Sequence, residues 1–214
     1  MFSVIFDMDG TLTDTQRIFI PAWDLAGNNQ GFENAGVNVE YVCGANDEYC
    51  TNFIIERFKG IDVQRFKKDV ADYIAENGKS KLKDGVVEIL SFLKKNKIKM
   101  AIASGAPVSV IERHIKATGI AEYFDVITSG DEAEVENSKP APDIFLLTAK
   151  RMGVNAEDCI VFEDSSNGII AGHAAGMKCI GVADIVPFND EALKKAYKCF
   201  DRIDEAIPLL EEYI

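Results

Sequence analysis

The chain has 214 residues, of which 47% are hydrophobic and 27% charged, and its 23 basic and 35 acidic side chains give a formal net charge of −12. This length suits one α/β domain, or a core domain of about 150 residues with a smaller appendage. The acidic balance argues against nucleic acid and anionic membrane surfaces as partners, because both bind clusters of Lys and Arg. No apolar run reaches about 18 residues, so we expect no membrane-spanning helix.

The first strand is predicted at residues 2–6, which are rich in β-branched and aromatic side chains. It ends in two carboxylates, Asp7 and Asp9, followed by Gly10 and Thr11. Asp and Gly are common turn residues, so one interpretation is an acidic turn. The other is a functional site, because ligands of open α/β sheets gather outside the carboxyl ends of the strands.

A small helical module is predicted after this strand. Amphipathic patterns indicate helices at residues 17–26, around 53–58, and from about 62 to 77. Residues 28–50 are rich in Asn and Gly and show little periodicity. We therefore predict an inserted helical domain over residues 15–82, with residues 79–81 as the return linker.

From Asp84 onward, helices and strands alternate. Helices are expected after Asp84-Gly85 and at residues 107–119, 142–152, 169–175 and from about 204, and strands at 98–103, 124–128, 159–162 and 178–182. This alternation predicts an α/β fold with a Rossmann-like parallel sheet covered by helices on both faces. The core domain would comprise residues 1–14 and 83–214, with a looser tail after residue 182.

Polar side chains recur where the predicted strands end. Ser104 follows the second strand and Glu163-Asp164 follow the fourth, while Lys139 precedes a helix. In a parallel sheet these ends lie on one rim. Four carboxylates there need a compensating cation, and hard oxygen ligands suit Mg²⁺.

Phosphoryl-transfer chemistry follows from these parts. One carboxylate can attack phosphorus, a second can move the proton, and a hydroxyl and an ammonium can hold the phosphoryl oxygens. Each residue alone has a simpler interpretation: Ser104-Gly105 as a turn, Lys139 as a solvated lysine, and Glu163-Asp164-Ser165 as a helix cap. The ordered combination favours the functional interpretation.

Four segments carry a resemblance to a known family. They are Asp7-Met8-Asp9-Gly10-Thr11-Leu12-Thr13-Asp14, Ala103-Ser104-Gly105, Ser138-Lys139-Pro140-Ala141-Pro142-Asp143-Ile144-Phe145 and Phe162-Glu163-Asp164-Ser165-x-x-Gly168-Ile169. In order and spacing they resemble the four motifs of the haloacid dehalogenase (HAD) superfamily. The chain is similar to its β-phosphoglucomutase-like and small sugar-phosphatase group, in which a helical cap follows the first motif.

The resemblance implies a role for each matching residue. Asp7 would be the nucleophile, and Asp9 the general acid and base. Ser104 and Lys139 would bind the transferring phosphoryl group, with Gly10, Thr11 and Gly105 shaping the phosphate site. Mg²⁺ would be held by Asp7, Asp9 through its main-chain carbonyl, and Asp164 with Glu163 beside it. Asp9 also argues against dehalogenation, because the dehalogenases lack an acid there.

Departures from the mutase pattern concern the substrate. Phe19 stands where the mutase has a histidine, and Gly44-Ala45-Asn46-Asp47 replaces a loop of Gly-x-Ser-Arg type. A mutase needs cationic side chains that hold the distal phosphate of its bisphosphate intermediate. Because these two positions supply no cation here, we expect a phosphatase acting on a small phosphorylated metabolite such as a sugar or polyol phosphate. A β-phosphoglucomutase-type phosphomutase and a catalytically silent binding protein on the same fold are the alternatives.

Other residues receive structural interpretations. His114 is placed on a polar helix face and His173 in a helix of small residues, each without a partner, while Trp23 is as consistent with packing as with substrate contact. Five scattered cysteines, without a C-x-x-C pair, predict reduced thiols in a cytoplasmic protein. No feature demands more than a monomer. Movement of the cap about linkers near Thr15 and Lys81 is expected.

Overall fold

A six-stranded parallel sheet forms the centre of the molecule. The computed structural model describes residues 2–42, 47–78 and 81–214. The strand order is β3-β2-β1-β4-β5-β6, and every neighbouring pair is parallel. The strands are β1 (Ser3–Phe6), β2 (Met100–Ser104), β3 (Val126–Ser129), β4 (Cys159–Glu163), β5 (Lys178–Val182) and β6 (Lys198–Phe200). The central strand β1 is buried along its whole length, as its continuous hydrophobic run predicts for a parallel sheet.

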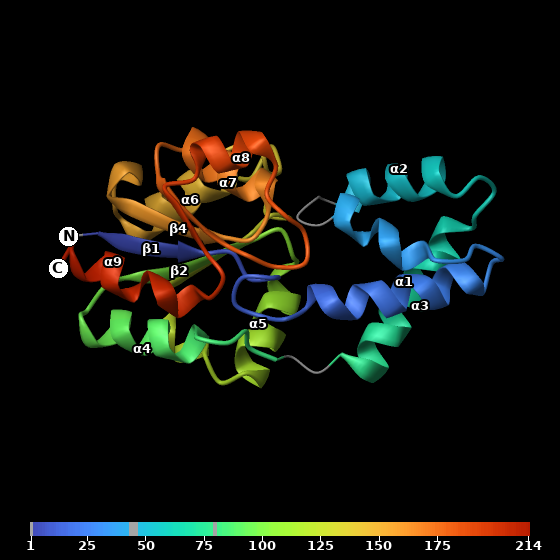
Figure 1. Cartoon of the computed structure of the whole chain (residues 1–214), viewed down its shortest axis with the longest axis horizontal. Helices are drawn as coiled ribbons and strands as arrows, with labels where there is room; N and C mark the ends of the chain where they lie inside the picture. Colours follow the sequence, from blue (N-terminus) through green and yellow to red (C-terminus); the bar gives the residue numbers. More distant parts are fainter. Residues whose placement is uncertain (1, 43–46, 79–80) are drawn as a thin grey trace.

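Helices cover both faces of the sheet (Figure 1). One layer contains α4 (Val86–Lys95), α5 (Val108–Ala117) and α9 (Ile207–Glu211); the other contains α6 (Asp143–Met152), α7 (Ser166–Ala174) and α8 (Asp190–Lys195). Because side chains alternate along a strand, Val4 and Phe6 pack into the first layer and Ile5 into the second. The predicted fold class, a parallel α/β sheet with helices on both faces, is confirmed.

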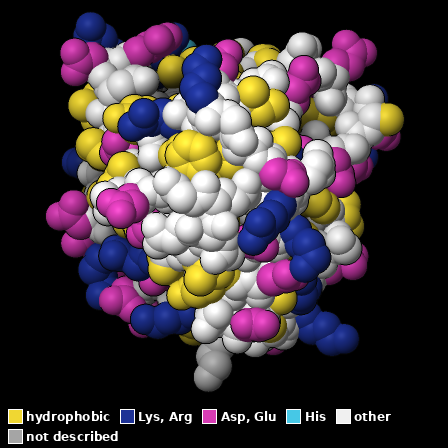
Figure 2. All heavy atoms as spheres, turned by 90° about the vertical axis from the view of Figure 1, so that its right-hand side faces the viewer, with side chains coloured by type: hydrophobic (Ala, Val, Ile, Leu, Met, Phe, Trp, Pro, Cys, Tyr) yellow, Lys and Arg dark blue, Asp and Glu magenta, His cyan; other side chains and the backbone are white. Residues whose placement is uncertain are grey.

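A separate helical part lies beyond the sheet (Figure 1). It contains α1 (Gln16–Asn28), a 3₁₀ helix (Ala35–Tyr41), α2 (Asp47–Arg57) and α3 (Val63–Asn77). These elements share their own apolar cluster, in which the Trp23 and Phe66 rings meet edge to face with centroids 5.2 Å apart. Figure 2, which views this end of the molecule, shows basic and acidic side chains interspersed over its surface. We call these elements the helical cap.

Two paired segments connect the cap to the sheet, residues 12–15 and 81–83. Asp14 donates its amide N–H to the carbonyl oxygen of Lys81 at 2.9 Å, and Lys83 donates to that of Leu12 at 3.0 Å. An antiparallel bridge joins Thr13 to Leu82 between these bonds. The two linkers therefore form one short ribbon rather than two independent crossings. Residues 79–80 of the predicted return linker lie outside the described residues.

Several element boundaries differ from the sequence prediction. The second strand begins at Met100 rather than residue 98, because Ile98 donates its N–H to Leu93 and closes α4. Residues 28–50 contain the 3₁₀ helix and the start of α2, which the weak periodicity did not indicate. The tail after residue 182 is more regular than predicted, since α8 and the short, mostly exposed β6 lie there.

Helix α4 begins directly after Asp84-Gly85, as predicted. Its N-cap residue is Gly85, in a left-handed conformation with φ 88° and no side-chain cap bond. A Cβ at this position would lie 2.1 Å from Oδ1 of Asp204, so the close approach of the C-terminal segment requires glycine. No helix within the described residues is both long enough and apolar enough to cross a membrane.

Candidate active site

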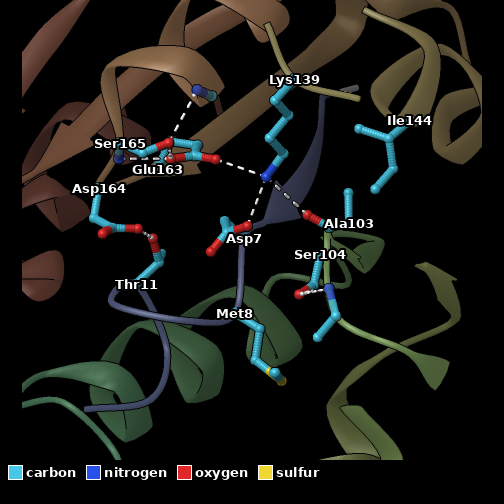
Figure 3. Close-up of polar contacts among 12 residues, drawn as sticks. Asp7, Met8, Thr11, Ala103, Ser104, Lys139, Ile144, Glu163, Asp164 and Ser165 are labelled. Atoms are coloured by element: carbon cyan, nitrogen blue, oxygen red, sulfur yellow. Dashed lines mark hydrogen bonds and ion pairs between the residues drawn. The ribbon is translucent and has the colours of Figure 1, made fainter. Parts of the chain in front are cut away.

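The carboxyl ends of three adjacent strands converge at one point of the sheet rim (Figure 3). Asp7 follows β1 and donates its N–H to the carbonyl oxygen of Phe162 in β4 at 2.9 Å. Ser104 is the last residue of β2 and Glu163 the last of β4. All three side chains are buried, and they lie on one rim as predicted from a parallel sheet.

Lys139 lies at the centre of this group. Its Nζ donates to Oδ1 of Asp7 at 2.6 Å, to Oε1 of Glu163 at 2.7 Å, and to the carbonyl oxygen of Ala103 at 3.3 Å. The residue is only 8% exposed. Burial works to lower the pKa of Lys139, but the attraction of Asp7 and Glu163 outweighs it and raises that pKa above its usual value. Lys139 is therefore a fixed positive charge beside Asp7.

Carboxylates outnumber cations at this point. Burial raises the pKa of Asp7 to about 7; Lys139 opposes the shift, while repulsion from Glu163 and Asp9 adds to it. The pKa of Asp164 is raised too, by burial first and then by repulsion from Glu163, Asp7 and Asp184. Such an excess of buried negative charge matches the environment that a divalent cation neutralises.

Glu163 directs its two oxygens to different partners. Oε1 accepts from Lys139, while Oε2 accepts from the amide of Ser165 at 2.7 Å and its hydroxyl at 2.8 Å. Ser165 in turn caps α7 by accepting from the amide of Gly168 at 3.0 Å. Glu163, grouped by the sequence with the metal ligands, thus orients Lys139 and the start of α7.

Gly168 is a site residue whose role the sequence did not indicate. A Cβ at this position would lie 1.7 Å from Oε1 of Glu163, the atom that accepts from Lys139. The sequence shows that Gly168 belongs to the fourth motif. That only glycine fits there becomes clear once the position of the Glu163 side chain in the fold is known.

We expect Gly168→Ala to lower the midpoint of thermal unfolding and reduce turnover, although alanine favours a helix by about 1 kcal/mol over glycine. The added methyl group must displace Glu163 and, through it, Lys139. Thermal unfolding followed by circular dichroism measures the first effect. Asn167→Ala, one residue earlier in α7, is the matched control and should leave both properties near wild type; a stable, fully active Gly168→Ala would contradict the assignment.

The loop after β1 is held by local hydrogen bonds. The amides of Leu12 and Thr13 both donate to the carbonyl oxygen of Met8 at 2.9 Å, and Gly10, with φ 88°, donates to Thr13 at 2.8 Å. The hydroxyl of Thr11 donates to Oδ1 of Asp164 at 3.1 Å. Thr11 thereby ties the first motif to the fourth.

Asp9 is turned toward the cap linker. Its Oδ1 accepts from the hydroxyl of Thr15 at 2.6 Å. Burial raises the pKa of Asp9, opposed first by that hydrogen bond and then by the attraction of His114. His114, half-buried on α5, therefore lies within electrostatic reach of Asp9, and its placement on a partnerless polar face is wrong. Its spacing of three residues from the buried Ile111 could have indicated an inward side chain.

The remaining phosphate-site candidates lie at the end of β2. Ser104 is 1% exposed, and its Oγ accepts from the amide of Ala106 at 3.1 Å. Gly105 is exposed, and a Cβ there would meet no other atom within 4 Å. The structure thus places Ser104 against the rim and gives Gly105 no close neighbour that would require glycine.

The donor set fits Mg²⁺ in a particular way. Within residues 2–42, 47–78 and 81–214, no three His, Cys, Asp or Glu side chains form a ready metal cluster. Figure 3 shows the carboxylates of Asp7 and Asp164 facing the same space beside Lys139. Mg²⁺ is usually bound by one or two carboxylates, with water and substrate phosphate completing the shell. The carboxylates of Asp7 and Asp164 with the main-chain carbonyl of Asp9 would therefore be enough protein ligands for Mg²⁺.

Comparison with known proteins agrees with this arrangement. A carbohydrate-phosphate phosphatase of Thermotoga maritima, named "phosphorylated carbohydrates phosphatase", is 30% identical over the full length of both chains. A fructose-1-phosphate phosphatase of Escherichia coli is 32% identical over 84% of this chain and 95% of its own. The solved structure of β-phosphoglucomutase from Clostridium difficile has a TM-score of 0.79 at 28% identity, covering 100% of this chain and 97% of that one.

Family membership follows from the sequence as well as the fold. Residues 3–176, which include all four motifs, match the model of haloacid dehalogenase-like hydrolases. The chain is an enzyme of the haloacid dehalogenase-like hydrolase family.

Proposed function

We propose that this enzyme is a Mg²⁺-dependent phosphatase that hydrolyses a small phosphorylated metabolite, a sugar or polyol phosphate, through an aspartyl phosphate on Asp7. The observation that carries the proposal is the buried contact of Lys139 with both Asp7 and Glu163, with Asp164 beside them. This arrangement supports the proposal, because the carboxylate of Asp7 lies next to a fixed cation that can also hold a phosphoryl oxygen.

Asp7, Asp164 and the main-chain carbonyl of Asp9 would hold Mg²⁺ in this proposal. Glu163 would lie beside this set, with Oε1 held by Lys139 and Oε2 held by Ser165. When bound, Mg²⁺ supplies positive charge that screens the repulsion between the carboxylates and the phosphoryl oxygens.

The chain's own residues perform two steps. A carboxylate oxygen of Asp7 attacks phosphorus, the bond from phosphorus to the leaving oxygen breaks, and the acid of Asp9 protonates that oxygen. Asp9 then removes a proton from water as the water attacks phosphorus, which releases inorganic phosphate and frees Asp7. Its raised pKa suits Asp9 to the donor role. Lys139 and Ser104 hold the phosphoryl oxygens, and Gly10, Thr11 and Gly105 shape the surrounding loops.

The cap supports hydrolysis over the mutase reaction. Phe19 packs partly buried against the apolar cluster of the cap, so this position brings no cation for a second phosphate. Residues 44–46 of the other departure lie outside the described residues. The relatives named above as phosphatases of phosphorylated carbohydrates and of fructose 1-phosphate support a sugar phosphate as substrate. Similarity to a β-phosphoglucomutase keeps a phosphomutase as the second candidate.

The proposal also covers the organisation of the chain. We assign residues 1–14 and 83–214 to the core domain and residues 15–82 to the cap, because the cap has its own apolar cluster and the paired linkers connect it to the core. We also propose that the protein is a cytoplasmic monomer that binds neither nucleic acid nor membranes. The negative net charge argues against those two partners, and the scattered cysteines without a C-x-x-C pair favour a reducing compartment.

A panel of phosphorylated metabolites, assayed for phosphate release with Mg²⁺ and with EDTA, tests this function. We expect release from at least one sugar or polyol phosphate with Mg²⁺, and loss of nearly all activity with EDTA. Glucose 1-phosphate with its bisphosphate activator separates the second candidate. Isomerisation faster than phosphate release would identify a mutase, and release that is indifferent to EDTA would contradict the metal dependence.

A further inference from the structure

The turn after β3 lies against the loop that follows β2. We call residues 104–106 the β2 loop and residues 129–132 the β3 turn. Ser104 and Ser129, the last residues of their strands, are paired in register in the parallel sheet. The amide of Gly130 extends this pairing by donating to the carbonyl oxygen of Ser104 at 2.8 Å. The β3 turn therefore starts beside the β2 loop, on the rim that carries the candidate active site.

Ser129 holds the other end of the β2 loop. Its hydroxyl donates to the carbonyl oxygen of Ala106 at 2.6 Å, and the residue is fully buried. Because the amide of Ala106 donates to Oγ of Ser104 at 3.1 Å, fixing Ala106 also fixes the Ser104 side chain. The β3 turn thus binds the loop on both sides of Gly105, through Gly130 before it and through Ser129 after it.

Gly130 also sets the distance between the turn and the loop. A Cβ at this position would lie 3.0 Å from the Cα of Gly105 and 3.4 Å from its carbonyl oxygen. Both are backbone atoms, so they cannot turn aside as the end of a flexible side chain can. A side chain at residue 130 would therefore push the β2 loop away by a few tenths of an ångström.

The β3 turn is itself fixed by core residues. Glu132 accepts from the amide of Ser129 through Oε1 at 2.7 Å, and through Oε2 from Nη2 of Arg151 in α6 at 2.6 Å. The hydrogen bond from Arg151 lowers the pKa of Glu132, which keeps this carboxylate ionised. Asp131 contacts Oγ of Ser129 through Oδ1 and donates its amide to the same Oγ at 3.3 Å, so the Ser129 hydroxyl proton is shared between Ala106 and Asp131. These bonds give the β2 loop a support that does not involve the cap.

We propose that Ser129 and Gly130 are positioning residues for the transferring phosphoryl group: they fix the β2 loop, and with it the Ser104 hydroxyl, where that hydroxyl can hold a phosphoryl oxygen. The part of this inference that concerns turnover rests on the proposed phosphatase function. Neither residue needs to touch the substrate. Because the phosphoryl group is common to all substrates of such an enzyme, the effect of either residue should not depend on the leaving group.

Ser129→Ala and Gly130→Ala test this role by opposite changes. The first removes the hydrogen bond to Ala106 and frees the loop, and the second adds a methyl group that pushes the loop away. We expect kcat/KM to fall by about 10-fold in each variant, since a misplacement of 1 Å can cost about 100-fold and these displacements are smaller. The fall should be the same, within about 2-fold, for the sugar phosphate identified by the panel and for p-nitrophenyl phosphate, whose leaving groups differ.

Binding of inorganic phosphate, measured by titration calorimetry with Mg²⁺ present, gives a readout that needs no turnover. Phosphate carries no leaving group, so its dissociation constant should rise by about 5-fold in both variants, as expected when a hydrogen bond to a charged group is weakened. Thr148→Val is the matched control for Ser129→Ala. It removes another buried hydroxyl, which donates to the carbonyl oxygen of Ile144 at 2.7 Å within α6. It should leave phosphate binding and kcat/KM within about 2-fold of wild type.

Hydrogen exchange of the Gly130 and Ala106 amides reports on the loop itself. The Gly130 amide donates to the carbonyl oxygen of Ser104, and the Ala106 amide donates to its Oγ. Both amides should exchange faster in Ser129→Ala than in wild type and in Thr148→Val.

A lower midpoint of thermal unfolding in Ser129→Ala, with phosphate binding and kcat/KM unchanged, would show a purely structural role and overturn the proposal. A loss confined to one of the two substrates, or unchanged exchange of both amides, would overturn it as well. If the wild-type protein releases phosphate from no substrate, the proposed function fails instead, and amide exchange still decides whether Ser129 fixes the β2 loop.

Discussion

Asp7→Asn is expected to lower kcat for phosphate release by about 10⁴-fold or more, which corresponds to a loss of roughly 5 kcal/mol of transition-state stabilisation. Asparagine lacks the carboxylate that attacks phosphorus. It has nearly the same size, and its amide oxygen can accept the hydrogen bond that Lys139 now donates to Asp7 at 2.6 Å. The fold should therefore survive, and thermal unfolding alongside the kinetic assay checks this.

The control for this variant is Asp158→Asn. Asp158 is an exposed aspartate at the end of the short turn before β4, where it accepts from Asn155 at 3.1 Å, far along the strand from the rim. This substitution removes the same charge and should leave kcat within about 2-fold of wild type. Undiminished hydrolysis by Asp7→Asn would remove Asp7 from the mechanism.

Lys139→Met should be the most destabilising single change at the site. It leaves Asp7 and Glu163 buried without their shared cation, and breaking a buried ion pair from one side costs about 3–5 kcal/mol. For a protein of this size we expect the midpoint of thermal unfolding to fall by roughly 10 °C. Turnover should be lost as well, because Asp7 loses its neighbouring cation and the phosphoryl group its ammonium ligand.

The stability loss should depend on pH with a defined sign. Burial already raises the pKa of Asp7 to about 7, and removal of Lys139 should raise it further. An acid whose pKa is higher in the folded than in the unfolded state destabilises the fold increasingly as pH rises above its ordinary value. The deficit of Lys139→Met should therefore be smaller at pH 5 than at pH 8.

Lys150→Met, on the exposed side of α6, provides the comparison at the same two pH values. It should change the midpoint by no more than a degree or two. A Lys139→Met protein as stable as wild type at pH 8 would show that the ammonium is not what balances the carboxylates.

Much of the fold could be predicted because a parallel sheet buried on both faces leaves a simple pattern. Mostly apolar runs such as residues 2–6 and 159–162 mark its strands, and the segments between the strands carry helical periodicity. Prediction failed where tertiary contacts decide. Ile98 has the side chain of a strand residue but closes a helix through Leu93, and β6 is short and mostly exposed.

The active site was predictable to the level of which residues meet, but not how they are oriented. Strand ends place Asp7, Ser104 and Glu163 on one rim whatever their partners. The orientation of Glu163 toward Lys139 and Ser165, the turn of Asp9 toward Thr15, and the approach of His114 depend on packing between distant segments. The contact of Asp184 with Lys83 joins positions that no local pattern links.

The proposed mechanism requires that the phosphoryl group of the substrate is transferred to Asp7 before it reaches water. Rapid acid quenching during turnover, followed by borohydride reduction and peptide mass spectrometry, measures this most directly, because reduction converts an aspartyl phosphate to homoserine. We predict homoserine at residue 7 in the wild-type protein and none in Asp7→Asn. Turnover of the substrate with no reduced aspartate, or with the reduced residue at Asp9 or Asp164, would contradict the mechanism.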